Sequence, residues 1–359
     1  MSLVRDAQDL ASAPNRLSRG RPLHVAIVGA TGAVGAELID QLARRRFPVG
    51  QLRLLASPRS AGRSLSFNGQ SVRVEALGEH AFEGVDVAFF SAGAGISRDY
   101  IPIATAAGAI VVDNSSALRM NPHVPLVVPE VNAAALAAHC GVVANPNCVA
   151  AVAVMALWPL HRAAGIRRVT LATYQAASGA GAAAMEELRA STAAYLEGRA
   201  FHPQVLAHPY AFNLFSHDAK VDPETGYNGE ETKVMQELRK IMGAHDMAVG
   251  ITCIRVPVLR AHSMAMTVEL EQPLAVEEAR ALLAAAPGVR LVDDRAANHF
   301  PMPVEASGRD EVLVGRLRRD LSDPSGRSLA LFAVGDQLLK GAALNAIQIA
   351  EALIAAAPS

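Results

Sequence analysis

Residues 23–35 read LHVAIVGATGAVG, and this stretch decides the fold of the first part of the chain. Residues 23–28 form an apolar run that predicts a buried parallel strand, and the apolar spacing after the stretch indicates a helix to about Arg45. A strand, a glycine-rich loop and a helix in this order favour dinucleotide binding, because glycine lets the backbone approach a pyrophosphate at a helix N-terminus. A tight turn without a ligand is the alternative. The candidate contacts are Gly29, Thr31, Gly32, Ala33, Val34 and Gly35.

The next strand is predicted at residues 52–56, where an NAD-binding fold usually ends in an acidic residue that binds the ribose 2′-hydroxyl. Here the loop reads SPRSAGR, with hydroxyl and guanidinium groups and no acid. This composition favours a 2′-phosphate and therefore NADP, with Ser57, Arg59 and Ser60 as candidate contacts. An exposed basic loop is the alternative.

Strands and helices continue to alternate up to residue 144, which predicts an α/β fold with a doubly wound parallel sheet. A strand at 86–91 ends in Ser91 and Gly93, which are further candidate cofactor contacts. Asn68 and Gly69 predict a hairpin turn, residues 124–128 a further strand and residues 132–139 a helix.

The second half has a different pattern. Long strand-like runs at 168–177, 248–258 and 262–271 are separated by helices and by an irregular excursion at 199–229 that is rich in proline, histidine, asparagine and glycine. One helix is predicted at roughly 182–196, and the C-terminal helix from about residue 338. Few long strands with long connections predict a mixed or antiparallel sheet, which suits a substrate site and a subunit interface.

Composition limits the class of protein. A net charge of −1 without a basic stripe argues against nucleic acid, and no histidine spacing suggests a metal. The three cysteines, Cys140, Cys148 and Cys253, show no paired spacing, which indicates a reducing, cytoplasmic compartment. Residues 1–22 lack a signal-peptide core and are expected to form a disordered extension. The uncharged stretch 140–160 contains prolines and asparagines, so we expect no membrane span.

The chemistry centres on Asn145-Pro146-Asn147-Cys148, which lies between an apolar strand at 141–144 and an apolar helix at 149–157. Unpaired N–H groups and the helix dipole at such a turn lower a thiol pKa from about 8.5 toward about 4–7. A thiolate is a nucleophile, so Cys148 is a candidate for covalent catalysis. A small buried cysteine that starts a core helix is the alternative.

A cysteine nucleophile needs a proton-transfer partner, and His262, between two predicted strands, is the candidate. Arg255 could hold a carboxylate through a two-pronged hydrogen bond. Glu230 and Lys233 share a helix face, where they form either a surface ion pair or contacts to a substrate ammonium and phosphate. Gln175, at a strand end, is a candidate amide contact. For the histidine, the arginine and the glutamine, a structural role is the alternative.

Together these residues resemble the aspartate-β-semialdehyde dehydrogenase family, over nearly the whole chain. The matching motifs are residues 29–35, 57–62, 112–114 with Arg119 and Met120, 128–132, 145–148, 175–181, 230–233, 255–263 and 340–343. No single motif is decisive, but their order and spacing are highly specific.

The resemblance implies a Rossmann-type NADP-binding domain (23–147 plus 337–359) and an α+β catalytic and dimerisation domain with a mixed sheet (148–336). It implies a homodimer, with a tetramer as the alternative. Cys148 matches the nucleophile, His262 the acid/base, and Gln175 the residue that orients the intermediate. Arg255 and Glu230 match the contacts to the amino acid, and Arg119, Asn147 and Lys233 the phosphate site. Ser178, Gly179 and Gln337 match cofactor contacts.

The implied reaction is NADPH-dependent reduction of L-4-aspartyl phosphate to L-aspartate 4-semialdehyde and phosphate through a cysteine thioester. It belongs to lysine, diaminopimelate, threonine, methionine and isoleucine biosynthesis. Three departures from the family pattern are Val149, often threonine or serine; Gln337, often asparagine; and Ala261, where one branch has glycine. The alternatives are an N-acetyl-γ-glutamyl-phosphate reductase, which usually has glycine before the cysteine, and a non-catalytic NADP-binding paralogue.

Overall fold

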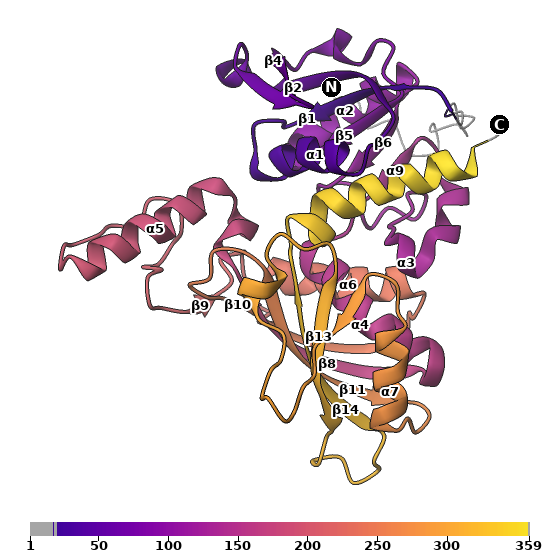
Figure 1. Ribbon diagram of the computed structural model, residues 1–359, viewed down its shortest axis with the longest axis vertical. Helices are drawn as coiled ribbons and strands as arrows, with labels where there is room; N and C mark the ends of the chain where they lie inside the picture. The colour runs from indigo at the N-terminus through magenta and orange to yellow at the C-terminus, as the bar shows by residue number, and fades with distance from the viewer. Residues whose placement is uncertain (1–16, 18–19, 358–359) are drawn as a thin grey trace. The chain divides into compact units, whose positions relative to one another are not determined.

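The structure, a computed structural model, describes residue 17 and residues 20–357 (Figure 1). Most of the expected N-terminal extension therefore lies outside the described residues. The chain divides into two compact units, Met1–Pro146 with Ala342–Ser359, and Asn147–Gly341. The predicted boundaries placed residues 147 and 337–341 in the first unit. They fall in the second because Asn147 caps a helix there and Gln337 bonds to Ser178 and Ala261.

The first unit is built on a seven-stranded sheet in the order β3-β4-β2-β1-β5-β6-β7. All pairs are parallel except the β3–β4 hairpin, whose turn residues Asn68 and Gly69 have φ of 49° and 77°. The strand order reverses at β1, which is where open α/β sheets bind ligands. The strands are β1 (Leu23–Val28), β2 (Val49–Ala56), β3 (Ser64–Phe67), β4 (Gln70–Ala76), β5 (Val87–Phe90), β6 (Ile110–Asp113) and β7 (Val142–Ala144).

Among the described residues of this unit, the α-helices are α1 (Ala33–Arg44), α2 (Ala94–Ala106), α3 (Pro129–Asn132) and α9 (Leu344–Ala356). The last helix packs against α1 and β6, and Ile347 and Leu353 lie in the same buried cluster as Leu38 and Leu17. The stretch Leu339–Ala356 is long and apolar enough to cross a membrane, but 67% of it is buried inside the protein. Core helices pass this length and composition test as well, so it is weak evidence for a membrane span.

The second unit contains a mixed seven-stranded sheet in the order β12-β13-β14-β11-β8-β10-β9. The β8–β10 and β12–β13 pairs are parallel and the other pairs antiparallel. A parallel doubly wound sheet followed by a mixed sheet confirms the predicted fold class. The strands are β8 (Ile166–Gln175), β9 (Phe215–Ser216), β10 (Ala248–Arg255), β11 (His262–Leu270), β12 (Val289–Leu291), β13 (Val312–Arg319) and β14 (Ser328–Gly335).

One face of this sheet is covered by helices of the same unit. The apolar helix α4 packs against α6, α7 and four of the strands. Buried and exposed residues alternate along β8, so Arg168, Thr170 and Tyr174 point to the uncovered face. The helices are α4 (Cys148–Ala164), α5 (Ala182–Leu196), α6 (Gly229–Met242), α7 (Val276–Ala284) and α8 (Pro303–Ala306).

Some predicted elements are wrong. Residues 124–128 make only an isolated bridge, between Leu126 and Ala144. Pro125 has no N–H group to donate and a turn precedes it, so a continuous ladder of hydrogen bonds does not form. The helix predicted over 132–139 is a 3₁₀ segment, Ala133–Ala138, after the short α3. The C-terminal helix starts with a π-helical turn, Leu339–Ala343.

Candidate active site

Cys148 is the accessible residue of an otherwise buried segment. Every other residue of 141–157 is buried, whereas Cys148, the first residue of α4, is half-buried. Asn147 caps the helix, because its Oδ1 accepts the N–H groups of Val149 (2.8 Å) and Ala150 (3.3 Å). Burial raises the pKa of the Cys253 thiol to about 12, so that cysteine stays protonated. The position of Cys148 at a helix N-terminus favours its thiolate.

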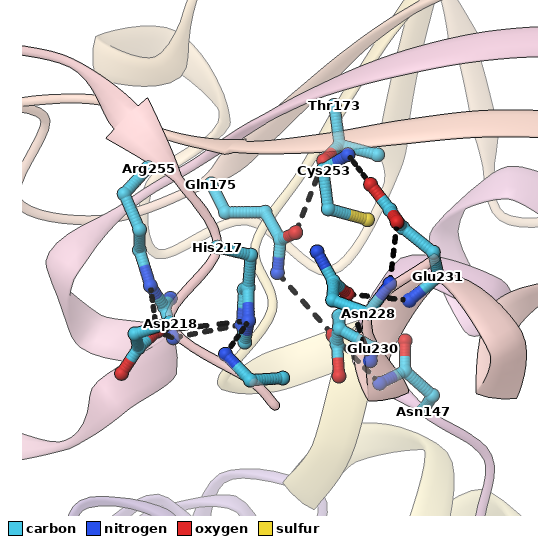
Figure 2. A network of polar contacts seen from close by, with 11 residues as sticks. Asn147, Thr173, Gln175, His217, Asp218, Asn228, Glu230, Glu231, Cys253 and Arg255 are labelled. Atoms are coloured by element: carbon cyan, nitrogen blue, oxygen red, sulfur yellow. Dashed lines mark hydrogen bonds and ion pairs between the residues drawn. The ribbon is translucent and has the colours of Figure 1, made fainter. Parts of the chain in front are cut away.

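Glu230 is the centre of a buried polar network in the second unit (Figure 2). Its Oε1 accepts Nδ2 of Asn147 (2.9 Å) and Nε2 of Gln175 (3.3 Å). The amide oxygen of Gln175 accepts the hydroxyl of Thr173 (3.0 Å). No ion pair joins Glu230 to the half-buried Lys233 in the part of the chain that the structure describes, so the surface-pair alternative does not hold. The network brings together three of the predicted site residues.

Arg255 is held from one side by two residues of the irregular excursion, and Figure 2 shows this group beside Gln175. Its Nη2 lies 2.9 Å from Nε2 of His217, and its Nε and Nη2 lie 3.2 and 3.1 Å from Oδ1 of Asp218. Burial and Arg255 both lower the pKa of His217, so its ring is neutral and accepts this hydrogen bond. The remaining nitrogen, Nη1, is buried and has no partner among the described residues. In this arrangement Nε and Nη2 already have partners, so Nη1 is the nitrogen open to a ligand, and the two-pronged hydrogen bond to a carboxylate stays a prediction.

His262 is completely buried, with one ring nitrogen bonded and the other open. Its Nδ1 lies 3.0 Å from the backbone N–H of Ala176, and a backbone N–H can only donate. The neutral ring therefore carries its proton on Nε2, which is buried and has no partner among the described residues. Burial lowers the pKa of His262 well below its ordinary value, and nearby Arg255 and His217 act in the same direction. At rest, His262 is thus a hydrogen-bond donor.

The two open nitrogens converge on the same place, above Gly179. A methyl group built on Gly179 would lie 2.9 Å from Nε2 of His262 and 3.3 Å from Nη1 of Arg255. Two buried N–H donors without partners are costly unless a ligand oxygen binds there. The arrangement can therefore hold a carboxylate or a developing oxyanion.

Ser178 and Gln337, two predicted cofactor contacts, bond to each other through their side chains. Oε1 of Gln337 also accepts the N–H of Ala261 (2.9 Å), the residue before His262. Both side chains are buried, and their contact to a cofactor stays a prediction.

In the first unit, the loops after β1, β2 and β5 share one edge of the sheet. Gly29 has φ of 88°, and a side chain there would meet the Ser91 carbonyl at 2.6 Å; at Gly35 it would meet the Gly29 carbonyl at 2.3 Å. The helix that follows has no side-chain cap, so its first N–H groups remain open to a phosphate. These features fit a pyrophosphate.

The other predicted cofactor residues lie around this edge. Arg59 is exposed in the turn Pro58–Ser60 that follows β2, where a 2′-phosphate would need a cation. Ala33 and Val34 begin α1, and the remaining candidates are Thr31, Gly32, Ser57, Ser60 and Gly93. The set therefore fits a dinucleotide that carries a 2′-phosphate.

Arg119 also lies in the first unit, where it is buried. Its Nε donates to the carbonyl of Asn145 (2.9 Å) and its Nη2 to that of Asn114 (2.7 Å). Its predicted role at the phosphate site stays a prediction. Across residues 17 and 20–357 the structure contains no cluster of histidine, cysteine or carboxylate side chains that could hold a metal.

Comparison with known proteins identifies the family. The model of the semialdehyde dehydrogenase NAD binding domain matches residues 24–139, and that of the semialdehyde dehydrogenase dimerisation domain matches residues 157–340. The aspartate-semialdehyde dehydrogenase of Synechocystis sp. is 51% identical over 93% of this chain and 98% of its own. The chain belongs to the aspartate-semialdehyde dehydrogenase family. The family member of Bacillus subtilis is 44% identical over 93% of this chain and 98% of its own.

A solved structure of this family has the same fold. The crystal structure of aspartate-semialdehyde dehydrogenase II from Vibrio cholerae, complexed with ASA, is 40% identical, covers 94% of this chain and 99% of its own, and gives a TM-score of 0.90. These matches account for the sequence and the fold of the chain without the alternative family, the N-acetyl-γ-glutamyl-phosphate reductases.

Sequence reasoning missed several residues around the aspartate-semialdehyde dehydrogenase site. His217 and Asp218 lie in the excursion between α5 and α6, where binding residues often occur on loops, and this was the available signal. Tyr210, whose hydroxyl is buried, and Glu237 gave none. The departure at residue 261 has a structural cost, because Ala261 has φ of 74°, a conformation that costs about 1–2 kcal/mol outside glycine.

Proposed function

We propose that this chain catalyses the reversible NADPH-dependent reduction of L-4-aspartyl phosphate to L-aspartate 4-semialdehyde and phosphate, a step of lysine, threonine, methionine and isoleucine biosynthesis. One observation carries the proposal. The accessible thiol of Cys148 starts a capped helix in the same unit as two buried donors that converge above Gly179. That combination suits a covalent acyl intermediate and the binding of a carboxylate or oxyanion.

The residues divide the work as follows. The Cys148 thiolate attacks the acyl phosphate carbon, the carbon–oxygen bond to phosphate breaks, and a thioester forms. When bound, NADPH would supply the hydride to the thioester carbon. The carbon–sulfur bond then breaks, which releases the semialdehyde and returns the Cys148 thiolate. His262 donates from Nε2 to the substrate oxygen that becomes negative, and Arg255 offers Nη1 to the α-carboxylate. Glu230 and Gln175 bind the ammonium group and the acyl chain, while Lys233 supplies positive charge for phosphate.

The decisive experiment is an assay of phosphate-dependent NADP reduction, with aspartate semialdehyde and N-acetylglutamate semialdehyde in parallel. We expect turnover with the first substrate, dependence on phosphate, and little turnover with the second. Cys148→Ser should keep the fold and lose nearly all activity, because a hydroxyl is not ionised near neutral pH. Preference for the acetylated substrate would assign the chain to the rival reductase, and no turnover with either would favour a non-catalytic paralogue.

The choice of NADP over NAD is supported by the loop after β2, which has a guanidinium group and no acid. Arg59→Glu should weaken NADPH far more than NADH, since only NADPH carries a 2′-phosphate. Binding titrations of the two cofactors to both proteins measure the difference. Equal weakening of both, or no change, would show that Arg59 does not read the 2′-phosphate.

The uncovered face of the second sheet supports a homodimer, because half of the residues on β8 and β10 point outward without a covering helix. Thr170→Glu should place a like charge in this interface and give monomers by light scattering, while wild type gives dimers. Leu321→Glu, at a side chain that is 91% exposed in a loop, is the matched control and should stay dimeric. A tetrameric wild type would add a second interface. We place the enzyme in the cytoplasm, where its thiols stay reduced.

A further inference from the structure

The helix α6 presents a second buried carboxylate to the nucleophile turn, seven residues after Glu230. Glu237 is 1% exposed, and its Oε2 accepts the backbone N–H of Asn147 at 2.5 Å. Residues seven apart lie on the same side of a helix, so Glu230 and Glu237 face the start of α4 together. α6 and α4 pack against each other within the second unit.

Asn147 is therefore held at three of its atoms. Glu237 accepts the main-chain N–H, Glu230 accepts Nδ2 at 2.9 Å, and Oδ1 accepts the N–H of Val149 at 2.8 Å. Asn147 immediately precedes Cys148. The first bond holds the Pro146–Asn147 peptide, and the other two hold the Asn147 side chain. A charge-assisted hydrogen bond to a carboxylate is about twice as strong as a neutral one.

A buried negative charge beside a thiol opposes the thiolate through like-charge repulsion, so Glu237 is not suited to activating Cys148. The negative charge of Glu237 disfavours the thiolate form of Cys148, yet the carboxylate holds the backbone at Asn147. We therefore assign it to the geometry of the turn. We infer that Glu237 is a positioning residue that fixes the Pro146–Asn147 peptide, one residue before Cys148, so that the thiolate meets the acyl carbon. This inference rests on the proposed function of Cys148.

Glu231 provides a matched control on the same helix. It is also a buried carboxylate that accepts backbone N–H groups, from Cys253 and Asn228 at 2.9 Å each. Those bonds fix the start of α6 and strand β10, and neither of them is made to Asn147. A purely structural role for Glu237 predicts that Glu231→Gln and Glu237→Gln have the same consequences.

The test compares Glu237→Gln, Glu237→Leu and Glu231→Gln in the semialdehyde assay. An amide keeps an acceptor without the charge, so we expect kcat to fall about 3- to 10-fold with glutamine; with leucine it should fall about 100-fold, the cost of a misplacement near 1 Å. The KM values for semialdehyde and NADP should change less than about 3-fold in both, since Glu237 is buried and acts through the backbone of Asn147. Glu231→Gln should lower the unfolding temperature and leave kcat unchanged.

Hydrogen–deuterium exchange in the peptide that covers residues 145–150 gives a readout independent of turnover. Exchange should rise there in Glu237→Leu and stay unchanged in Glu231→Gln. A folded leucine variant with wild-type kcat and exchange would overturn the inference, as would equal kcat losses in the two glutamine variants. If leucine prevents folding, the comparison of the two glutamine variants decides. A wild type without turnover would refute the proposed function, while the exchange comparison would still test Glu237.

Discussion

At the level of single residues, the site depends on a missing side chain. Gly179 leaves open the space into which Nη1 of Arg255 and Nε2 of His262 point. Its φ does not lie in the left-handed region, so the backbone tolerates other residues and only the space requires glycine. Ser178 and Gly179 were predicted as cofactor contacts, and the geometry gives Gly179 a second role toward the substrate.

Gly179→Ala should therefore raise the KM for aspartate semialdehyde. A methyl group in this space blocks a charged hydrogen bond worth about 1.5–3 kcal/mol, which corresponds to roughly 10- to 150-fold in kcat/KM. The unfolding temperature should also fall, because the methyl group would stand 2.9 Å from Nε2 of the completely buried His262 and one of the two must move. Gly229→Ala, where a new methyl meets nothing closer than 3.8 Å, is the control. Wild-type semialdehyde kinetics in Gly179→Ala would place the carboxylate elsewhere.

The sequence predicted those site residues whose chemistry is visible in one short motif. Cys148 and His262 were singled out because of a helix start and a strand junction. Glu237 and His217 were missed, because they act through partners 90 and 38 residues away, and such pairs exist only after α6 and β10 have packed. A pattern of neighbouring residues in the sequence does not predict a contact between residues that only the tertiary structure brings together.

At the level of elements, the π-helical turn Leu339–Ala343 supports the nucleophile from the C-terminal side. Gly341, within this turn, lies so close to Cys148 that a methyl group on it would stand 2.9 Å from Cβ of the cysteine. π-helical turns are rare and are often found at functional sites. The apolar pattern predicted a regular helix from about residue 338, because periodicity does not distinguish the wider turn.

Gly341→Ala should push Cys148 away from its position. Overpacking of this kind costs about 1–3 kcal/mol of unfolding free energy. We expect kcat to fall and iodoacetamide to alkylate Cys148 more slowly, while alkylation of Cys140, in the other unit, stays unchanged as an internal control. Unchanged labelling and turnover would mean that the turn relaxes without moving the nucleophile.

Long, regular elements were predicted well. The strand at 23–28 and the helix at 182–196 are confirmed with the same bounds as β1 and α5. The short elements β12 and α8 were not predicted, since three or four residues carry too little periodicity. Pairing partners decide whether such short segments become strands.

At the level of the whole molecule, buried histidines make stability depend on pH. Burial lowers the pKa values of His139, His161, His217 and His262, so these rings stay neutral in the folded protein at pH values where the unfolded chain is protonated. The unfolded state then binds more protons, and the free energy of unfolding rises with pH. The free energy of unfolding therefore depends little on these histidines above about pH 7.5. It falls with decreasing pH once the histidines of the unfolded chain, with a pKa of about 6.5, become protonated.

Urea unfolding at pH 7.5, 6.5 and 5.5 measures this dependence. Stability should fall at the lower pH values, and a histidine that stays neutral only when folded contributes up to about 1.4 kcal/mol per pH unit. His262→Gln should reduce the slope, because the completely buried ring no longer titrates on unfolding. A slope that is unchanged in this variant would mean that His262 is protonated in the folded protein.

The last helix has a consequence for synthesis on the ribosome. The core of the first unit includes Ile347 and Leu353 of α9, whereas the second unit is one continuous segment, Asn147–Gly341. Translation proceeds at about 5–20 residues per second, so the strands that begin the first unit are made long before residues 344–356, which form the helix that completes its core. Nascent chains arrested before residue 342 should therefore leave the nucleotide-binding unit sensitive to protease. The second unit, Asn147–Gly341, can therefore complete its core before the first unit does.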